Sequence, residues 1–97
     1  MEIIGHLIDG KRSQQAARTQ DVFNPATGEV SKKVAIASKE TVEEAITVAQ
    51  AAYPEWRNTP PLKRARIMFN YKALLEKHSD KICELIGAEH GKICHDA

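Results

Sequence analysis

The 97-residue sequence contains few cysteines, few aromatic residues and no excess of charge of either sign. Two cysteines cannot build a disulfide framework, so we expect a reducing compartment, the cytoplasm. With 14 basic and 13 acidic side chains, the net charge of +1 gives no general reason to expect a nucleic-acid or membrane partner. No apolar run approaches the roughly 20 residues that cross a bilayer, and the N-terminal segment lacks the features of a secretory signal or transit peptide.

The composition is that of an ordinary globular domain, with 42% hydrophobic and 28% charged residues. This length suffices for one small domain and is too short for two. It therefore counts against a self-sufficient multi-domain enzyme.

A first hairpin is predicted near the N-terminus. Residues 6–8 and 11–13 flank Asp9 and Gly10, a dipeptide favoured in type I′ turns because both central residues need positive φ. The polar residues 14–20 that follow are expected to form a loop.

A second hairpin is predicted with strands near residues 21–24 and 29–36. Asn24 can bond to its own backbone, Pro25 presets φ for its position, and Gly28 can adopt the left-handed conformation that closes the loop. The spacing indicates a loop of four or five residues.

The first of three predicted helices begins after Ser38, a good N-cap, with Glu40 in its first turn near the helix dipole. Because Pro54 disfavours a helical Tyr53, the regular helix is expected to end or kink near Ala52. Its apolar stripe comprises Val42, Ala45, Ile46, Ala49, Ala52, Tyr53 and Trp56.

The second helix is predicted to start with Thr59 as N-cap and Pro60 and Pro61 in its first turn. Its main apolar stripe comprises Ile67, Met68, Tyr71, Leu74 and Leu75. A second apolar row, on roughly the opposite side, comprises Leu62, Ala65, Phe69 and Ala73. A helix that is apolar on two faces is usually sandwiched between layers, and two hairpins with one helix offer little to cover both.

The third helix is predicted from about Ser79, with Ile82, Leu85 and Ile86 facing inward and Gly91 as its stop. Residues 93–97 resemble the first turn of another helix. The order ββββααα, two β-hairpins followed by three helices, indicates an α+β unit.

The strongest metal-like cluster is Cys83, His90, Cys94 and His95. Zinc prefers these ligand types, but the spacing lacks the paired Cys-x2-Cys knuckle, and neighbouring Cys94 and His95 diverge by about 100° on a helix. A cysteine–histidine nucleophile pair fails on the same geometry. We therefore expect core or surface cysteines and solvated histidines rather than a metal site or a catalytic pair.

The basic cluster Lys63, Arg64 and Arg66 could touch phosphate, which leaves a small nucleic-acid binder as a weak alternative. It lacks interleaved aromatic residues for base stacking, and a solvated or salt-bridged face is the better interpretation. No glycine-rich dinucleotide or phosphate-loop pattern is present. The residues alone thus contain no catalytic constellation.

Several motifs in order resemble the aldehyde dehydrogenase superfamily. They are Ile8-Asp9-Gly10-Lys11, Val22-Phe23-Asn24-Pro25-Ala26-Thr27-Gly28-Glu29-Val30, Ala51-Ala52-Tyr53-Pro54-Glu55-Trp56, Arg64-Ala65-Arg66-Ile67 with Leu74-Leu75-Glu76, and Glu89-His90-Gly91-Lys92. The resemblance runs from about residue 6 to residue 97. Within the superfamily, Glu89-His90-Gly91-Lys92 and residues 65–72 are most similar to methylmalonate-semialdehyde dehydrogenases.

This resemblance implies NAD-dependent oxidation of methylmalonate or malonate semialdehyde through a cysteine nucleophile, with coenzyme A (CoA) as acyl acceptor. It also implies that residues 1–97 are the N-terminal portion of the NAD-binding domain, an α/β domain in the full-length parent, with hairpins at about 6–36 and helices at about 39–97. The nucleophile, the oxyanion-site asparagine and the NAD contacts lie downstream in the family. We therefore expect no catalytic, cofactor-binding or metal-binding residue here, and no catalytic role for Cys83 or Cys94.

Our expectation from the sequence is an N-terminal fragment of such an enzyme, inactive alone. The alternative from another class is a stand-alone interaction module that keeps the scaffold without the chemistry. In either case, an uncovered apolar surface on the second helix predicts self-association, and hence an oligomer.

Overall fold

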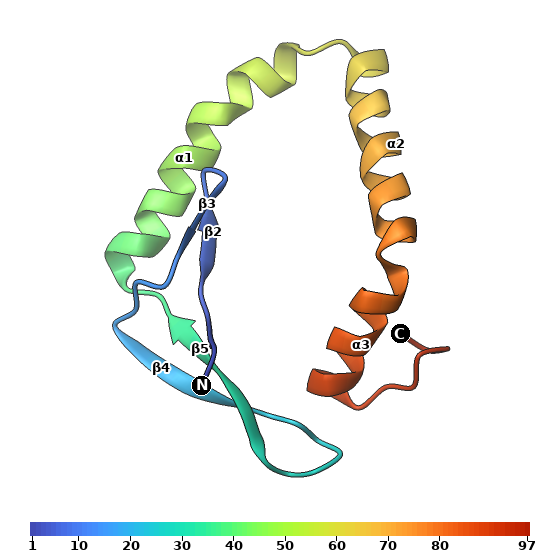
Figure 1. Ribbon diagram of the computed structural model, residues 1–97. Coiled ribbons are helices and arrows are strands. Elements are labelled where there is room, and N and C mark those ends of the chain that lie inside the picture. The colour runs from blue at the N-terminus through green and yellow to red at the C-terminus, as the bar shows by residue number, and fades with distance from the viewer.

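The computed structural model describes residues 1–97 as five strands followed by three helices (Figure 1). The elements are β1 (Ile3–Ile4), β2 (His6–Ile8), β3 (Lys11–Ser13), β4 (Arg18–Phe23), β5 (Val30–Ile36), α1 (Lys39–Asn58), α2 (Pro61–Lys77) and α3 (Ser79–His90). This confirms an α+β chain of strands followed by three helices. One strand more than expected is present, because β1 precedes the two predicted hairpins.

The two hairpins belong to separate sheets. Strands β2 and β3 form a two-stranded antiparallel sheet, whereas β5 lies between β1 and β4 in a three-stranded sheet. In that sheet β4 is antiparallel to β5 and β1 is parallel to it, with Ile3 opposite Lys33 and Ile4 opposite Val34. The pairing of β1 was missed because a two-residue strand has no periodicity, and its partner lies about thirty residues later in the sequence.

Strand β4 begins at Arg18, three residues earlier than predicted, so the end of the expected 14–20 loop is wrong. Arg18, Thr19 and Gln20 are exposed and polar, and pair with Ile36, Ala35 and Val34 of β5. Their strand conformation therefore comes from the ladder of backbone hydrogen bonds rather than from a buried face.

The predicted turns and the first helix cap are confirmed. Asp9 and Gly10 have φ of 54° and 70°, the positive values that a type I′ turn requires. At the start of α1, the Ser38 hydroxyl accepts a hydrogen bond from the Thr41 backbone N–H at 3.2 Å.

Helix α1 does not end near Ala52 as predicted, but continues through Pro54 to Asn58. Thr59 is its C-cap and not the N-cap of α2: its hydroxyl donates to the Glu55 carbonyl at 2.9 Å and its N–H to the Trp56 carbonyl at 3.1 Å. These bonds hold the turn that follows the proline. Helix α2 starts at Pro61 without a side-chain cap, and α3 starts at Ser79 as predicted.

The helices form an open arch over the sheets rather than a layer upon them (Figure 1). The Cα radius of gyration is 17.1 Å and the smallest dimension is 16 Å, whereas a compact chain of this length has a radius of about 13 Å. Only Ala35 and Thr41 are buried. The chain therefore has almost no core of its own.

Both predicted apolar rows of α2 are exposed except at the half-buried Ala65, with Phe69 at 69%, Leu62 at 65% and Met68 at 54%. On α3, Ile82 and Ile86 are half-buried while Leu85 is 41% exposed. Periodicity located these stripes, but the described chain supplies no layer to cover them. No helix is long and apolar enough to cross a membrane.

Candidate functional site

The turn between β4 and β5 is held by the side chain and backbone of Asn24. Its Oδ1 accepts from the Ala26 N–H at 2.9 Å, and its carbonyl accepts from the Gly28 N–H at 2.8 Å. Gly28 has a φ of 73°, as the sequence predicts. The Asn24 N–H donates to the Glu29 carbonyl at 2.9 Å, so the turn closes as a rigid tip.

This tip lies against the end of α3. Gly91 ends that helix with a φ of 75°, and its N–H donates to the Gly87 carbonyl at 3.0 Å. A Cβ added at Gly91 would lie 3.1 Å from Cγ of Pro25. The structure thus joins two motifs, Asn-Pro-x-x-Gly and Glu-His-Gly-Lys, that are far apart in the sequence.

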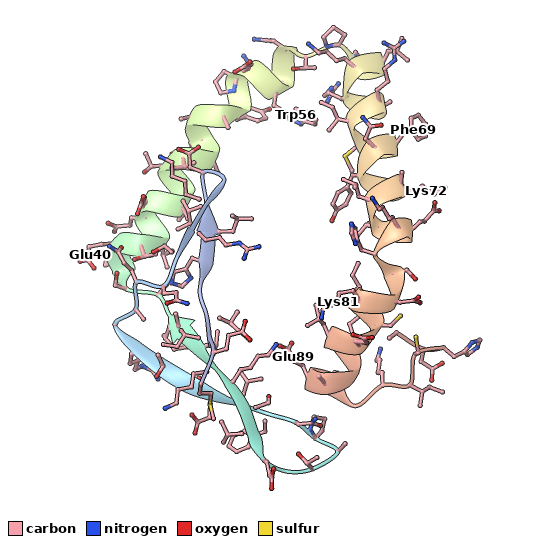
Figure 2. The ribbon with its side chains drawn as sticks, viewed as in Figure 1. Glu40, Trp56, Phe69, Lys72, Lys81 and Glu89 are labelled. Atoms are coloured by element: carbon pink, nitrogen blue, oxygen red, sulfur yellow. The ribbon has the colours of Figure 1, made fainter.

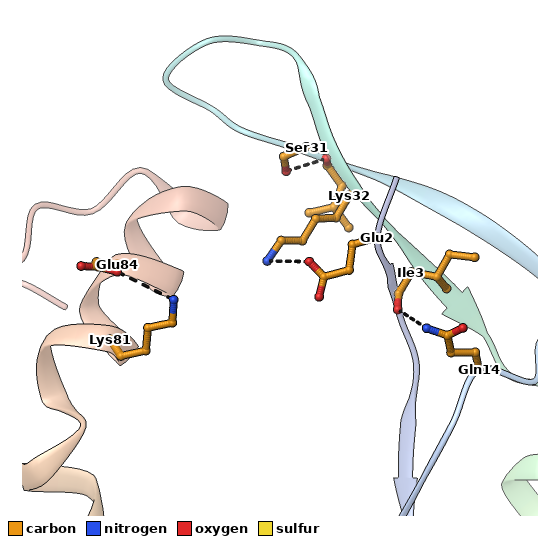
Figure 3. Close-up of polar contacts among 8 residues, drawn as sticks. Glu2, Ile3, Gln14, Ser31, Lys32, Lys81 and Glu84 are labelled. Carbon is orange, nitrogen blue, oxygen red and sulfur yellow. Dashed lines mark hydrogen bonds and ion pairs between the residues drawn. The ribbon is translucent and has the colours of Figure 1, made fainter.

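A hollow of about 390 Å³ lies between the N-terminal strand and the first hairpin. Two of its polar side chains hold the chain together: the Gln14 side chain donates to the Ile3 carbonyl at 3.2 Å, and Glu2 pairs with Lys32 at 3.8 Å (Figure 3). At its base, Gly5 approaches the Ser13 carbonyl so closely that a Cβ would collide with it. These contacts are architectural.

A second hollow, of about 470 Å³, lies between β2 and α1. Seven of its nine lining residues are apolar, and its polar members are His6 and Thr41. A dinucleotide needs clustered backbone N–H groups or cations for its pyrophosphate, and neither hollow provides a glycine-rich turn at a helix N-terminus. Neither hollow therefore has the features of a dinucleotide site.

Of the four predicted metal-like residues, the structure brings two together. The Cys83 thiol on α3 donates to the Cys94 carbonyl at 3.7 Å, and both cysteines are free. No group of three or more His, Cys, Asp or Glu side chains is arranged to hold a metal ion. Cysteine and histidine alone also lack the orienting group and oxyanion donors that nucleophilic catalysis needs.

The three members of the basic cluster differ in exposure. Lys63 and Arg66 are exposed, whereas Arg64 is half-buried with its Nε buried and unpartnered. The aromatic residues Trp56 and Phe69 lie on different helices, α1 and α2, as Figure 2 shows.

Residues 11–97 match the aldehyde dehydrogenase family, and the chain belongs to that family. The chain is 47% identical over its whole length to a malonate-semialdehyde dehydrogenase of Pseudomonas aeruginosa, of which it spans 20%. It is 49% identical over 75 residues to malonate-semialdehyde dehydrogenase 2 of Oceanobacillus iheyensis, covering 77% of this chain and 15% of that protein.

Two crystal structures share the fold. Methylmalonate-semialdehyde dehydrogenase (DddC) from Oceanimonas doudoroffii has a TM-score of 0.96 and 62% identity, covering 99% of this chain and 20% of that one. A Sinorhizobium meliloti 1021 protein, assigned as a methylmalonate-semialdehyde dehydrogenase and solved with NAD, has a TM-score of 0.93, 41% identity and the same coverage. The chain thus matches the N-terminal part of methylmalonate-semialdehyde dehydrogenases and spans about a fifth of their length.

Proposed function

We propose that this chain is the N-terminal part of the NAD-binding domain of an NAD-dependent, CoA-acylating methylmalonate- or malonate-semialdehyde dehydrogenase of the cytoplasm. Within it, residues 1–97 serve as scaffold and carry no catalytic or cofactor-binding residue. The observation that carries the proposal is the 62% identity over 99% of the chain to an enzyme of that name, at a TM-score of 0.96.

The lack of a core supports a scaffold role. A compact protein of 10.8 kDa exposes about 5,500 Å², whereas this chain exposes 8048 Å². The excess of about 2,500 Å² is larger than a standard protein interface of about 1,600 Å². Such a surface suits a segment that packs against the remainder of a larger polypeptide.

The same excess supports self-association of the chain when it is alone. We propose a second copy as the partner, seated on the apolar faces of α2, because its exposed residues form continuous rows along 17 helical residues. Burial of apolar surface supplies the driving force.

A chimera tests the enzymatic proposal. Residues 1–97 replace the matching fifth of the Oceanimonas doudoroffii enzyme, and NADH formation is followed with methylmalonate semialdehyde, CoA and NAD. We expect a folded chimera that retains activity within about tenfold of the parent, and loses most of it without CoA, while the 97-residue chain alone is inactive. A chimera that is misfolded or inactive, or a chain active by itself, would contradict the proposal.

A further inference from the structure

The residues after α3 turn back along that helix. Gly91 reverses the chain direction in the left-handed conformation, with a φ of 75°. The Lys92 carbonyl then lies over Gly87, where an added Cβ would be 3.3 Å from the carbonyl oxygen. The tail closes in a helical turn, with the Ala97 N–H donating to the Ile93 carbonyl at 3.1 Å. The missing side chain at Gly87 is what lets the tail approach.

Cys83 lies one helical turn before Gly87, on the same side of α3. The tail that passes over Gly87 continues to Cys94, whose carbonyl accepts the hydrogen bond from the Cys83 thiol at 3.7 Å. Cys94 is exposed and Cys83 half-buried. The fold thus places the two cysteines of the chain close together, with Cys94 exposed to solvent and Cys83 half-buried.

The electrostatics of Cys83 agree with this placement. Its pKa is raised above the ordinary value first by hydrogen bonding with Cys94, then by desolvation and by the like charges of Cys94 and Asp80. The raised pKa agrees with the position of Cys94 beside the Cys83 thiol. It also keeps Cys83 as a neutral thiol while the exposed Cys94 meets solutes first.

We propose that Cys83 and Cys94 form a reversible redox pair, in which a peroxide oxidises the chain to an intramolecular disulfide that fastens the 91–97 tail to α3. Cys94 loses its proton, and its thiolate attacks one oxygen of hydrogen peroxide. The O–O bond breaks, giving a sulfenic acid, and the hydroxide that leaves takes up the Cys94 proton as water. The Cys83 sulfur then attacks the Cys94 sulfur. The S–S bond forms, the S–OH bond breaks, and the Cys83 proton leaves with the hydroxyl as water, so two thiols and one peroxide give one disulfide and two waters.

The pair acts locally because the loop that it closes, from Cys83 to Cys94, is short. A disulfide of this span joins the tail directly to α3 at Cys83 and encloses only residues 83–94. In the reduced state, only the Cys83 thiol and backbone hydrogen bonds hold the tail. In the oxidised state, a covalent bond holds it. Thiol–disulfide exchange with a dithiol restores the reduced form.

Peroxide titration of the purified chain tests this proposal. We expect loss of both free thiols, a mass lower by two hydrogens, and monomer mobility on a non-reducing gel at every protein concentration, all reversed by dithiothreitol. Cys83→Ser should stop at a Cys94 sulfenic acid that dimedone traps. Oxidation that joins separate chains, or that modifies Cys83 before Cys94, would overturn the proposal.

A variant that keeps both thiols separates geometry from reactivity. Gly87→Leu places a side chain where the Lys92 carbonyl lies, so disulfide formation should slow by about tenfold or more, while Glu84→Leu, on the exposed side of the same helix, should leave the rate within twofold. Equal rates in both variants would show that the tail is not held over α3, and would refute the proposal.

Discussion

The ring of Pro25 lies against Gly91, where an added Cβ would approach Pro25 Cγ to 3.1 Å. This contact joins the tip of the β4–β5 hairpin to the end of α3, and so connects the last helix of the arch to the three-stranded sheet (Figure 1). Gly91 also holds a φ of 75°. Glycine is therefore required there for two independent reasons, a left-handed backbone and a close approach.

Gly91→Ala should destabilise the chain more than Gly10→Ala. Both glycines have positive φ, near 70–75°, but an added Cβ at Gly10 meets nothing within 4 Å. The shared backbone cost is about 1–2 kcal/mol, and the excess at Gly91 measures the contact with Pro25. Urea unfolding followed by far-UV circular dichroism gives both free energies.

A double variant isolates that contact. In a Pro25→Ala background the excess cost of Gly91→Ala should fall, because the opposing ring is gone. Equal costs at Gly10 and Gly91, or an excess that persists without Pro25, would mean that the hairpin tip does not rest on α3.

The uninterrupted α1 leads to a second prediction, that Pro54→Ala stabilises the chain. Proline inside a helix removes a backbone hydrogen bond and is less favourable than alanine by about 3 kcal/mol, and α1 continues four residues beyond it. The gain should be smaller than this value because proline also restricts the unfolded chain. Thermal unfolding should show a higher midpoint, and an unchanged or lower one would contradict a helical segment at 54–58.

Local chemistry explains what the sequence alone could predict. The turns at Asp9-Gly10 and Asn24–Gly28, the Ser38 cap and the Gly91 stop each depend on a few adjacent residues whose conformational preferences are strong. The strand β1 and the start of β4 depend instead on a partner strand, which adjacent residues do not reveal.

The apolar rows of α2 show a second limit. Periodicity identifies a face that will be covered, but it does not reveal what covers it, and in this chain Leu62 and Phe69 are covered by nothing. The spacing of Cys83, His90, Cys94 and His95 likewise predicts core or surface cysteines and solvated histidines, without indicating that the two cysteines lie close together. Cys83 and Cys94 lie close together because the chain reverses at Gly91 and the Lys92 carbonyl approaches Gly87. Residue spacing alone reveals neither effect.

A third prediction concerns the Cys83 thiol, whose pKa is raised chiefly by hydrogen bonding with Cys94. Cys94→Ala should return this pKa toward its ordinary value, and Asp80→Asn should lower it less, because Asp80 is the smallest contributor. Since the folded chain holds the proton more tightly, its stability is full below the unfolded pKa and falls as the pH rises through the folded one. Rates of Cys83 alkylation against pH, resolved by peptide mass spectrometry, measure the shift; equal effects of both variants would contradict the contact.

The last prediction is that polar residues on α2 weaken self-association. Leu62 and Phe69 are 65% and 69% exposed in the single chain, and fully burying such a side chain contributes about 1.5–3 kcal/mol. Replacing both, as Leu62→Ser with Phe69→Ser, should raise the dissociation constant at least about tenfold, since 1.4 kcal/mol corresponds to that factor. Sedimentation equilibrium over a range of concentrations gives the constant. Asn70→Ser, at an exposed polar position beside Phe69, is the matched control and should leave the dissociation constant unchanged. A wild-type chain that is monomeric at every concentration would show that a second copy does not cover this surface.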